Sequence, residues 1–176
     1  MTLEALQHLI RAATALAEDC QFLVLGSASL LASFPELSEA TSPLASTYDA
    51  DLCPQPFDEL TGLMLEEAMG DQRAYYRRHG YHADILKDSV LETLPGGWRD
   101  RLVEVPGCPG NHALSPSDLA AVKLLVGRPK DLQLLVTIRS LGLLSAPHVK
   151  QCVAQLNIPV EMTPRVQANY KHIFGE

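Results

Sequence analysis

The chain has 176 residues, of which 47% are hydrophobic, and its 14 Lys and Arg against 21 Asp and Glu give a formal net charge of −7. This length and hydrophobic content are typical of one soluble globular domain with a sizeable core, and they exclude a disordered chain. The acidic balance argues against a protein that coats nucleic acid, because neutralised phosphate supplies most of that affinity.

The cysteines and the apolar segments indicate a cellular compartment. The four cysteines lie far apart, with no Cys-x-x-Cys pair of the kind that zinc sites use. Residues 1–20 resemble an amphipathic helix rather than a secretory signal. No apolar run approaches the roughly 20 residues that span a bilayer. We therefore expect reduced thiols in a cytoplasmic protein that does not contact a membrane.

The first third of the chain predicts a helix followed by two strands. Residues 3–18 place leucine and alanine side chains on one helical face. The apolar run at 22–25 predicts a buried strand, which ends at a Gly26-Ser27 turn before a helix start at 28–33. Residues 35–46 predict a loop. The alternating segment 47–53 predicts a second strand that stops at Pro54.

The middle of the chain continues the α/β pattern. Residues 57–79 predict helix with a break near Gly70, and 81–86 predict a third strand. A Pro-Gly-Gly turn at 95–97 leads to a fourth strand near 101–105. The loop at 106–111, rich in proline and glycine, then separates this part from the rest of the chain.

The last third predicts helices. Ser115 and Pro116 are typical of a helix start, and Gly127 is typical of its end. Further helices are expected from Pro129 to about residue 141, after Pro147 and after Thr163. The whole pattern predicts an α+β fold with a small mixed sheet and flanking helices. We expect a single domain over 1–176, with an α/β core at 1–110 and a helical subdomain at 111–176.

Three aspartates on the predicted strands are the candidates for chemistry. Asp49 and Asp51 stand at i and i+2 of one strand and therefore share a face. Adjacent carboxylates repel one another unless a cation lies between them, and Mg²⁺ prefers such hard oxygen ligands. Asp84 on a neighbouring strand is expected to complete a site for two metal ions or to act as a base. The alternative is that this Asp-x-Asp pair caps a loop or faces solvent.

The Gly26-Ser27 turn lies between a strand and a helix start, where backbone N–H groups can bind phosphate. Taken alone, such a Gly-Ser pair is more often an ordinary turn than a phosphate site. The ordered combination of strand, Gly-Ser, helix, strand and Asp-x-Asp is more specific than either part. We find no Walker phosphate loop and no Gly-x-Ser-x-Gly elbow, which leaves P-loop and acyl-transfer readings without support.

This combination resembles the nucleotidyltransferase superfamily. Nearly the whole chain looks like an uncharacterised bacterial nucleotidyltransferase-like family. The segment LSPSDLAAVKLLVGRPKDLQLL resembles the helical part of abortive-infection (type IV) toxin nucleotidyltransferases. The matching stretches nearer the N-terminus are FLVLGSASLLASFPE, YDADLCP, the RRHGYHADI region and LPGGWRDRLVEV. Compared with the superfamily pattern, Ser27 and Asp49 are separated by a longer insertion.

The resemblance implies a set of site residues and a reaction. Asp49 and Asp51 would bind Mg²⁺, with Asp84 as the third acid, and Gly26 and Ser27 would hold the phosphates of an NTP. By the same resemblance, the nucleotide would also contact a second set: Lys123, Arg128, Lys130 and Asp131. The implied reaction transfers a nucleotidyl group to a hydroxyl of RNA, protein or a small molecule, with a toxin role as a sub-case. The alternative is an inactive nucleotidyltransferase scaffold that binds or regulates a partner protein.

Each basic residue also has a structural alternative. Lys123 can extend its ammonium from an apolar helix to water. Arg128, Lys130 and Asp131 can form an ordinary ion pair where two helices meet. A basic stretch at residues 73–79 reads as a solvated helix face or as a surface that guides an RNA end.

Overall fold

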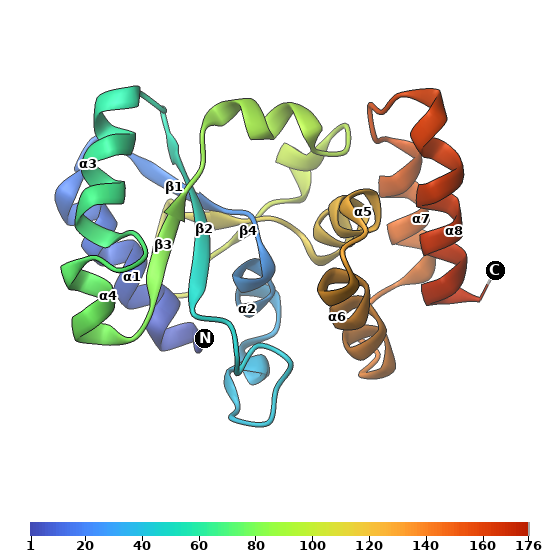
Figure 1. Ribbon diagram of the computed structural model, residues 1–176, viewed down its shortest axis with the longest axis horizontal. Coiled ribbons are helices and arrows are strands. Elements are labelled where there is room, and N and C mark those ends of the chain that lie inside the picture. The colour runs from blue at the N-terminus through green and yellow to red at the C-terminus, as the bar shows by residue number, and fades with distance from the viewer. Residues whose placement is uncertain (176) are drawn as a thin grey trace. The chain divides into compact units, whose positions relative to one another are not determined.

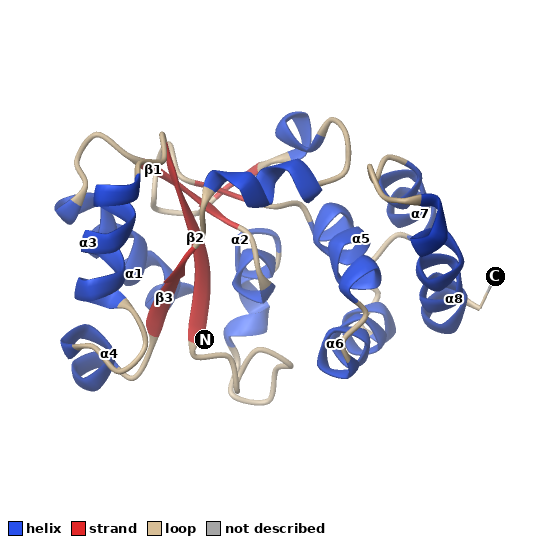
Figure 2. Ribbon diagram, turned by 45° about the horizontal axis from the view of Figure 1, so that its top comes forward, coloured by secondary structure: helices blue, strands red, loops and turns tan. Residues whose placement is uncertain are grey.

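The computed structural model describes residues 1–175 as a mixed α+β chain, which confirms the predicted fold class (Figure 1 and Figure 2). The chain forms two compact units. The first comprises Met1–Val90 and Leu102–Leu114, and the second comprises Leu91–Arg101 and the residues from Ser115 onward. The expectation that these parts form a single domain stays a prediction.

The first unit contains the sheet, four α-helices and two 3₁₀ segments. Its helices are α1 (Leu3–Leu16), α2 (Leu30–Ser33), α3 (Glu59–Met69) and α4 (Ala74–His79), with 3₁₀ segments η1 (Ser27–Ser29) and η2 (Pro35–Ser38). Its strands are β1 (Gln21–Val24), β2 (Asp49–Gln55), β3 (His82–Ile85), β4 (Val103–Glu104) and β5 (His112–Ala113). The break predicted near Gly70 is the break between α3 and α4.

The five strands lie in the order β3-β2-β1-β5-β4. β2 runs antiparallel to β1 and parallel to β3, and β1 runs parallel to β5, so the sheet is mixed as predicted. Figure 1 shows α1, α3 and α4 together on one side of β2 and β3, with α2 on the other side. β3 pairs with the N-terminal part of β2 (Asp49 to Leu52), where the candidate acids lie, and β1 pairs with its C-terminal part (Leu52 to Gln55).

Two strand predictions differ from the structure. β2 does not stop at Pro54 but continues to Gln55, with Pro54 opposite Phe22 of β1. The last hydrogen bond from the β3 side runs from the N–H of Leu86 to the carbonyl of Leu52. Pro54 lies beyond it, so the missing N–H of Pro54 removes no hydrogen bond between the strands. The strand β5 was not predicted, because two residues are too few to show a periodicity of two.

Burial alternates over the first part of β2, from Asp49 to Leu52, and Cys53 and Pro54 after it are both buried. Ala50 and Leu52 are completely buried, whereas Asp49 and Asp51 are only partly buried. Side chains two apart share a face, so the two aspartates lie on the face opposite Ala50 and Leu52. The sequence of β2 thus places apolar packing on one side and carboxylates on the other.

The second unit is helical. It contains the second half of η3 (Asp88–Thr93), η4 (Trp98–Arg101), α5 (Pro116–Val126), α6 (Pro129–Ser140), α7 (Ala146–Ala154), η5 (Val160–Met162) and α8 (Thr163–Phe174). α5 packs against α6, α7 and α8. The predicted boundaries are confirmed: Ser115 caps α5 by accepting from the Asp118 N–H, and Gly127 ends it in a left-handed conformation with φ of 65°.

All four cysteines, Cys20, Cys53, Cys108 and Cys152, are buried free thiols. Burial raises the pKa of the Cys53 and Cys152 thiols to about 11 in each case. At neutral pH both groups are therefore protonated.

Among residues 1–175, no helix is both long enough and apolar enough to cross a membrane.

Candidate functional site

Two strands bring the three candidate acids together in the first unit. In the parallel pairing of β2 and β3, Asp51 lies opposite Asp84 and Asp49 lies opposite His82. Paired residues in a sheet project to the same face, so Asp84 joins the carboxylates of Asp49 and Asp51. One carboxylate oxygen from each of the three lies within 4.8 Å of the others. The predicted convergence of the three acids is therefore present in the structure.

Gly26 lies directly against one of these acids. The backbone N–H of Leu25 donates to the carbonyl of Asp51 over 3.0 Å, which holds the end of β1 beside β2. A Cβ added at Gly26 would overlap Oδ2 of Asp51. Position 26 therefore has to be glycine if Asp51 is to keep its place, for a reason of space rather than backbone conformation.

The turn after Gly26 leads into η1, which packs against β2. Gly26 caps η1 and its carbonyl accepts from the Ser29 N–H, while Ser27 is the first residue of the segment. Gly26 and Ser27 are both partly exposed. The structure thus places the predicted phosphate-binding turn next to the acids, on the same short stretch of chain that adjoins Asp51.

His82 is a neighbour of the site that our sequence reasoning did not single out. Its Nε2 lies 3.3 Å from Oδ1 of Asp84, and its side chain is only 13% exposed, against 46% for Asp84. The ring of Tyr76 meets His82 edge to face, with 5.2 Å between centroids. The signal was available, because His82 precedes Asp84 by two positions on a strand and must share its face.

The chemistry of this donor set fits a hard divalent cation. Three carboxylates at this separation repel one another, and a cation bound among them removes that repulsion. All three offer oxygen, the ligand type that Mg²⁺ prefers, and they are partly exposed, which leaves room for water and substrate oxygens. Asp49, Asp51 and Asp84 are therefore the residues that could hold Mg²⁺, with one ion or two.

The second predicted set lies in the other unit, around Asp131 at the start of α6. Oδ1 of Asp131 accepts from Lys123 Nζ over 2.5 Å, and Oδ2 accepts from Arg128 Nε over 2.6 Å. Asp131 and the Lys123 side chain are almost completely buried, whereas the Arg128 side chain is 58% exposed. Lys130 is exposed.

The electrostatics of this cluster are those of a compensated ion pair. Burial alone would raise the pKa of Asp131, but the hydrogen bonds and charges of Arg128 and Lys123 hold that pKa below its ordinary value. Lys123 consequently does not extend its ammonium to water, as one alternative expected. Its charge is paired with Asp131, as is the charge of the largely exposed Arg128, while Lys130 carries its charge at the surface.

The basic stretch on α4 has mainly local contacts. Arg73 forms an ion pair with Glu67 over 2.9 Å, and Arg77 Nε donates to the carbonyl of Gln72. His79 lies in a cluster of rings with His8, Tyr75 and Tyr81. These contacts agree with the reading of a solvated helix face that is anchored by its aromatic side.

Comparison with protein families matches residues 1–173 to a family described as a nucleotidyltransferase of unknown function (DUF6036). Neither the curated proteins nor the solved structures include a significant match. Because the match spans nearly the whole chain, the protein belongs to this nucleotidyltransferase family.

Proposed function

We propose that the protein is a Mg²⁺-dependent nucleotidyltransferase whose metal ligands are Asp49, Asp51 and Asp84. The observation that carries the proposal is the convergence of these three carboxylates beside Gly26, in a chain of a nucleotidyltransferase family. The substrate would be a nucleoside triphosphate, and the acceptor a hydroxyl group of RNA, protein or a small molecule. The reaction forms a P–O bond from that hydroxyl to the α-phosphorus and releases pyrophosphate.

Each residue near the acids has a separate part in the proposal. When bound, Mg²⁺ would neutralise the negative charge of the triphosphate and of the departing pyrophosphate. Gly26 leaves the space in which Asp51 sits, and the backbone N–H groups of Gly26 and Ser27 would bind phosphate oxygens. His82, whose Nε2 lies 3.3 Å from Oδ1 of Asp84, would orient that carboxylate, as neighbours of metal ligands commonly do.

The second set, in the helical unit, is proposed to bind phosphate groups of a nucleotide through exposed cations. Arg128 and Lys130 carry exposed charges on the same turn of chain. Asp131 would act indirectly, because it receives the Arg128 guanidinium and the buried Lys123 ammonium. On this proposal, Arg128→Gln and Lys130→Gln weaken NTP binding, whereas they leave binding of the metal alone unchanged.

The test is calorimetric titration with each of the four NTPs, in the presence of Mg²⁺ and in its absence. We expect Mg²⁺-dependent binding of at least one NTP by the native protein and at least about a 10²-fold loss of affinity in Asp49→Asn/Asp51→Asn. Asp71→Asn, which removes an exposed acid outside the cluster, is the matched control. Binding that is equal in all three proteins, or absent from the native one, would contradict the proposal.

Turnover distinguishes an enzyme from an inactive scaffold. Incubation with α-labelled NTP and mixed cellular RNA or protein should transfer label to an acceptor and release pyrophosphate. Mg²⁺-dependent NTP binding with no transfer to any acceptor would favour the binding or regulatory protein instead. For the toxin sub-case, expression of the native chain should arrest bacterial growth and Asp49→Asn/Asp51→Asn should not.

A further inference from the structure

Helix α4 is attached to α1 by four side chains with rings, which we call the α1–α4 ring cluster. It consists of His8 of α1, Tyr75 and His79 of α4, and Tyr81 just before β3. The ring centroids of His8 and His79 lie 4.7 Å apart, and those of Tyr75 and His79 lie 4.5 Å apart. Within Ala74–His79, all of which the structure describes, no residue is fully buried. The attachment of α4 to α1 therefore depends on these ring contacts.

His8 has hydrogen-bond partners in the cluster that suit its neutral form. The hydroxyl groups of Tyr75 and Tyr81 each lie 2.8 Å from Nδ1 of His8. Burial raises the pKa of both tyrosines, so both hydroxyls keep their protons at neutral pH. In the tautomer with its proton on Nε2, Nδ1 of His8 accepts from a tyrosine hydroxyl. Protonation of the ring turns Nδ1 from an acceptor into a donor, and the hydroxyls then have to reorient.

The surroundings of the two imidazoles offer little negative charge to a pair of imidazolium groups. Partial burial lowers the pKa of His79, and the neighbouring His8 and Arg78 lower that pKa further. The charged and titratable side chains on the surrounding elements are Glu4 and Arg11 on α1, Glu67 on α3, Asp71 and Arg73 before α4, Arg77 and Arg78 on α4, and His82 and Asp84 on β3. Of the acids, Glu67 is paired with Arg73 and Asp84 lies beside His82, while Glu4 and Asp71 are exposed to water.

α4 also contacts a neighbour of the three carboxylates. The ring of Tyr76, which follows Tyr75 in α4, meets His82 edge to face with 5.2 Å between centroids. Nε2 of His82 in turn lies 3.3 Å from Oδ1 of Asp84. As long as the ring cluster holds α4 against α1, Tyr76 is held against His82.

We propose that the α1–α4 ring cluster is a pH-sensitive switch, in which protonation of the His8–His79 pair releases α4 and withdraws Tyr76 from His82. Because the pKa of His79 lies below its ordinary 6.5 while α4 is attached, attachment is complete above pH 6.5 and weakens as pH falls through the lower native value. Acid then loosens the surroundings of Asp84 through His82. Only this last link rests on the proposed function, because it takes Asp84 to be a metal ligand.

The experiment is NMR spectroscopy of the full, metal-free chain between pH 7.5 and pH 5.5. The amide protection factors of Ala74–His79, which correct for the intrinsic exchange rate, should fall at least about threefold relative to those of α1. The nuclear Overhauser contact between the rings of Tyr76 and His82 should weaken in parallel, and the His79 imidazole should titrate below pH 6.5. Unchanged protection of α4, or titration of His79 at or above pH 6.5, would overturn the proposal.

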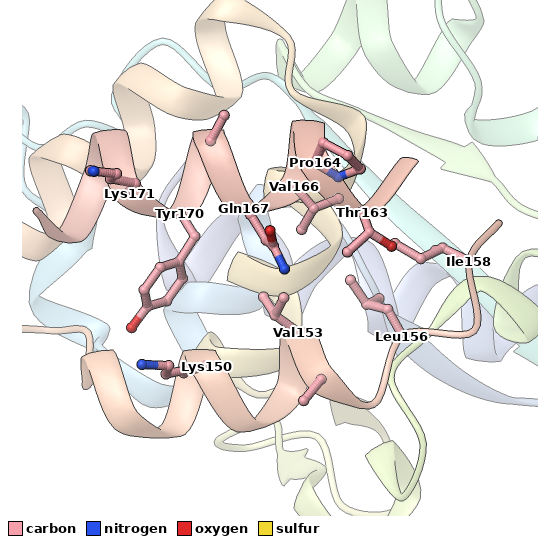
Figure 3. Close-up of a pocket in the computed structure, with 12 residues that line it drawn as sticks. Lys150, Val153, Leu156, Ile158, Thr163, Pro164, Val166, Gln167, Tyr170 and Lys171 are labelled. Carbon is pink, nitrogen blue, oxygen red and sulfur yellow. The ribbon is translucent and has the colours of Figure 1, made fainter. Parts of the chain in front are cut away.

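Two variants locate the switch. His79→Phe keeps a ring in the cluster but takes up no proton, so α4 should be equally protected at both pH values. If this variant already lacks protection of α4 at pH 7.5, His8→Asn replaces it, because the asparagine amide can occupy the place of Nδ1 without a charge. The matched control is His172→Phe. His172 is exposed on α8, which borders the apolar cavity shown in Figure 3, and it does not line that cavity. The same loss of protection in both cluster variants as in the native chain would refute the proposal.

The link to the carboxylates is measured separately with Mn²⁺. Protonation of the carboxylates themselves is common to the native chain and His79→Phe, so comparing their losses of Mn²⁺ affinity between pH 7.5 and pH 5.5 isolates the switch. The native chain should lose at least about twofold more affinity than His79→Phe. Equal losses would overturn the regulatory part of the proposal. Absence of Mn²⁺ binding at every pH would contradict the proposed function, whereas the NMR results on the metal-free chain would still test the switch.

Discussion

The two units place carboxylates in opposite electrostatic surroundings. In the sheet unit, Asp49, Asp51 and Asp84 are partly exposed and gather like charges within 4.8 Å of one another. In the helical unit, Asp118 and Asp131 are almost completely buried, and basic side chains bind both. A buried carboxylate is stable only if its charge is compensated, whereas partly exposed carboxylates that lie close together are candidate ligands for a cation.

Asp118 shows how complete the compensation is in the helical unit. Arg101 donates to both of its oxygens, with NH2 of Arg101 at 2.6 Å from Oδ1, and the Ser115 hydroxyl donates to Oδ2 over 2.6 Å. The comparison teaches that the aspartates of the two units differ in their partners. Asp118 and Asp131 are paired with basic side chains, whereas the aspartates of the sheet unit lie beside one another. Mutation of these aspartates should therefore affect stability in the helical unit and ligand binding in the sheet unit.

The largest expected effect is on stability, from Asp131→Ala. This change leaves the buried ammonium of Lys123 without its partner, and breaking a buried pair in this way costs about 3–5 kcal/mol. Asp49→Ala should instead leave the metal-free stability unchanged or raise it, because it removes like-charge repulsion. Urea unfolding monitored by circular dichroism measures both, with exposed Lys130→Ala as the control. Equal destabilisation by the two aspartate changes would contradict the comparison.

The next effect is on ligand binding, from Gly26→Ala. The new methyl group must displace the carboxylate of Asp51, and misplacement of a site group by about 1 Å can cost 10²-fold in activity. Mn²⁺ affinity and NTP affinity should both fall, with little change in unfolding free energy. Gly96→Ala is the control, since a Cβ there meets its nearest neighbours at ordinary contact distance. Retention of full Mn²⁺ affinity by Gly26→Ala would show that Asp51 is not a ligand.

A smaller effect is expected from His82→Ala. Loss of a residue that orients a metal-binding carboxylate costs about 10- to 100-fold in metal affinity, and the partial exposure of Asp84 places this case near the lower value. His82→Gln, which can still donate toward Asp84, should recover part of the loss. Mn²⁺ binding followed by electron paramagnetic resonance makes the measurement. If the native protein and His82→Ala bind Mn²⁺ with the same affinity, His82 does not orient a metal ligand and serves only in packing.

Acid should weaken the helical unit through Asp131. Its pKa is lowered from an ordinary 3.8, so the stability that it contributes is complete above pH 3.8 and is lost as pH falls through the lower native value. The unfolding free energy of the native protein should therefore fall below pH 4, and that of Asp131→Asn should fall less steeply. A parallel decline in both proteins would remove Asp131 as the cause.

The smallest effect is one that the two units share. Cys53 and Cys152, one in each unit, have pKa values raised by burial from 9.0 to about 11. Their contribution to stability is complete below pH 9 and is lost as pH rises through about 11. Both thiols should also react slowly with a disulfide reagent at pH 8 unless the chain is unfolded. Rapid reaction of either native thiol would contradict its burial.

Local signals in the sequence predict much of this structure. The cap at Ser115, the stop at Gly127 and the alternation of Asp49 and Asp51 all depend on residues within one turn or one strand. The convergence of Asp84 with the first two acids was also predicted, and it requires that the two strands be neighbours in the register that sets Asp84 opposite Asp51.

What the sequence did not predict depends on contacts between distant segments. β5 consists of two residues, His112 and Ala113, that form a strand only because β1 and β4 lie on either side of it. Pro54 can continue β2 because the ladder from β3 has already ended. The sequence of residues 91–101 does not indicate that this segment packs with the helices of the second unit. Its Arg101 pairs with Asp118, which comes after both β4 and β5 in the chain.

That last arrangement has a consequence for the order of synthesis. The ribosome releases Leu91, Leu94 and Trp98 before β4 and β5, yet these apolar side chains become buried in a unit whose helices begin at Pro116. During translation this apolar segment is therefore without its packing partners while the last strands of the sheet are synthesised. A chain truncated after Leu114 would contain every strand and also this apolar segment without its packing partners. We expect such a chain to aggregate even though its sheet is complete.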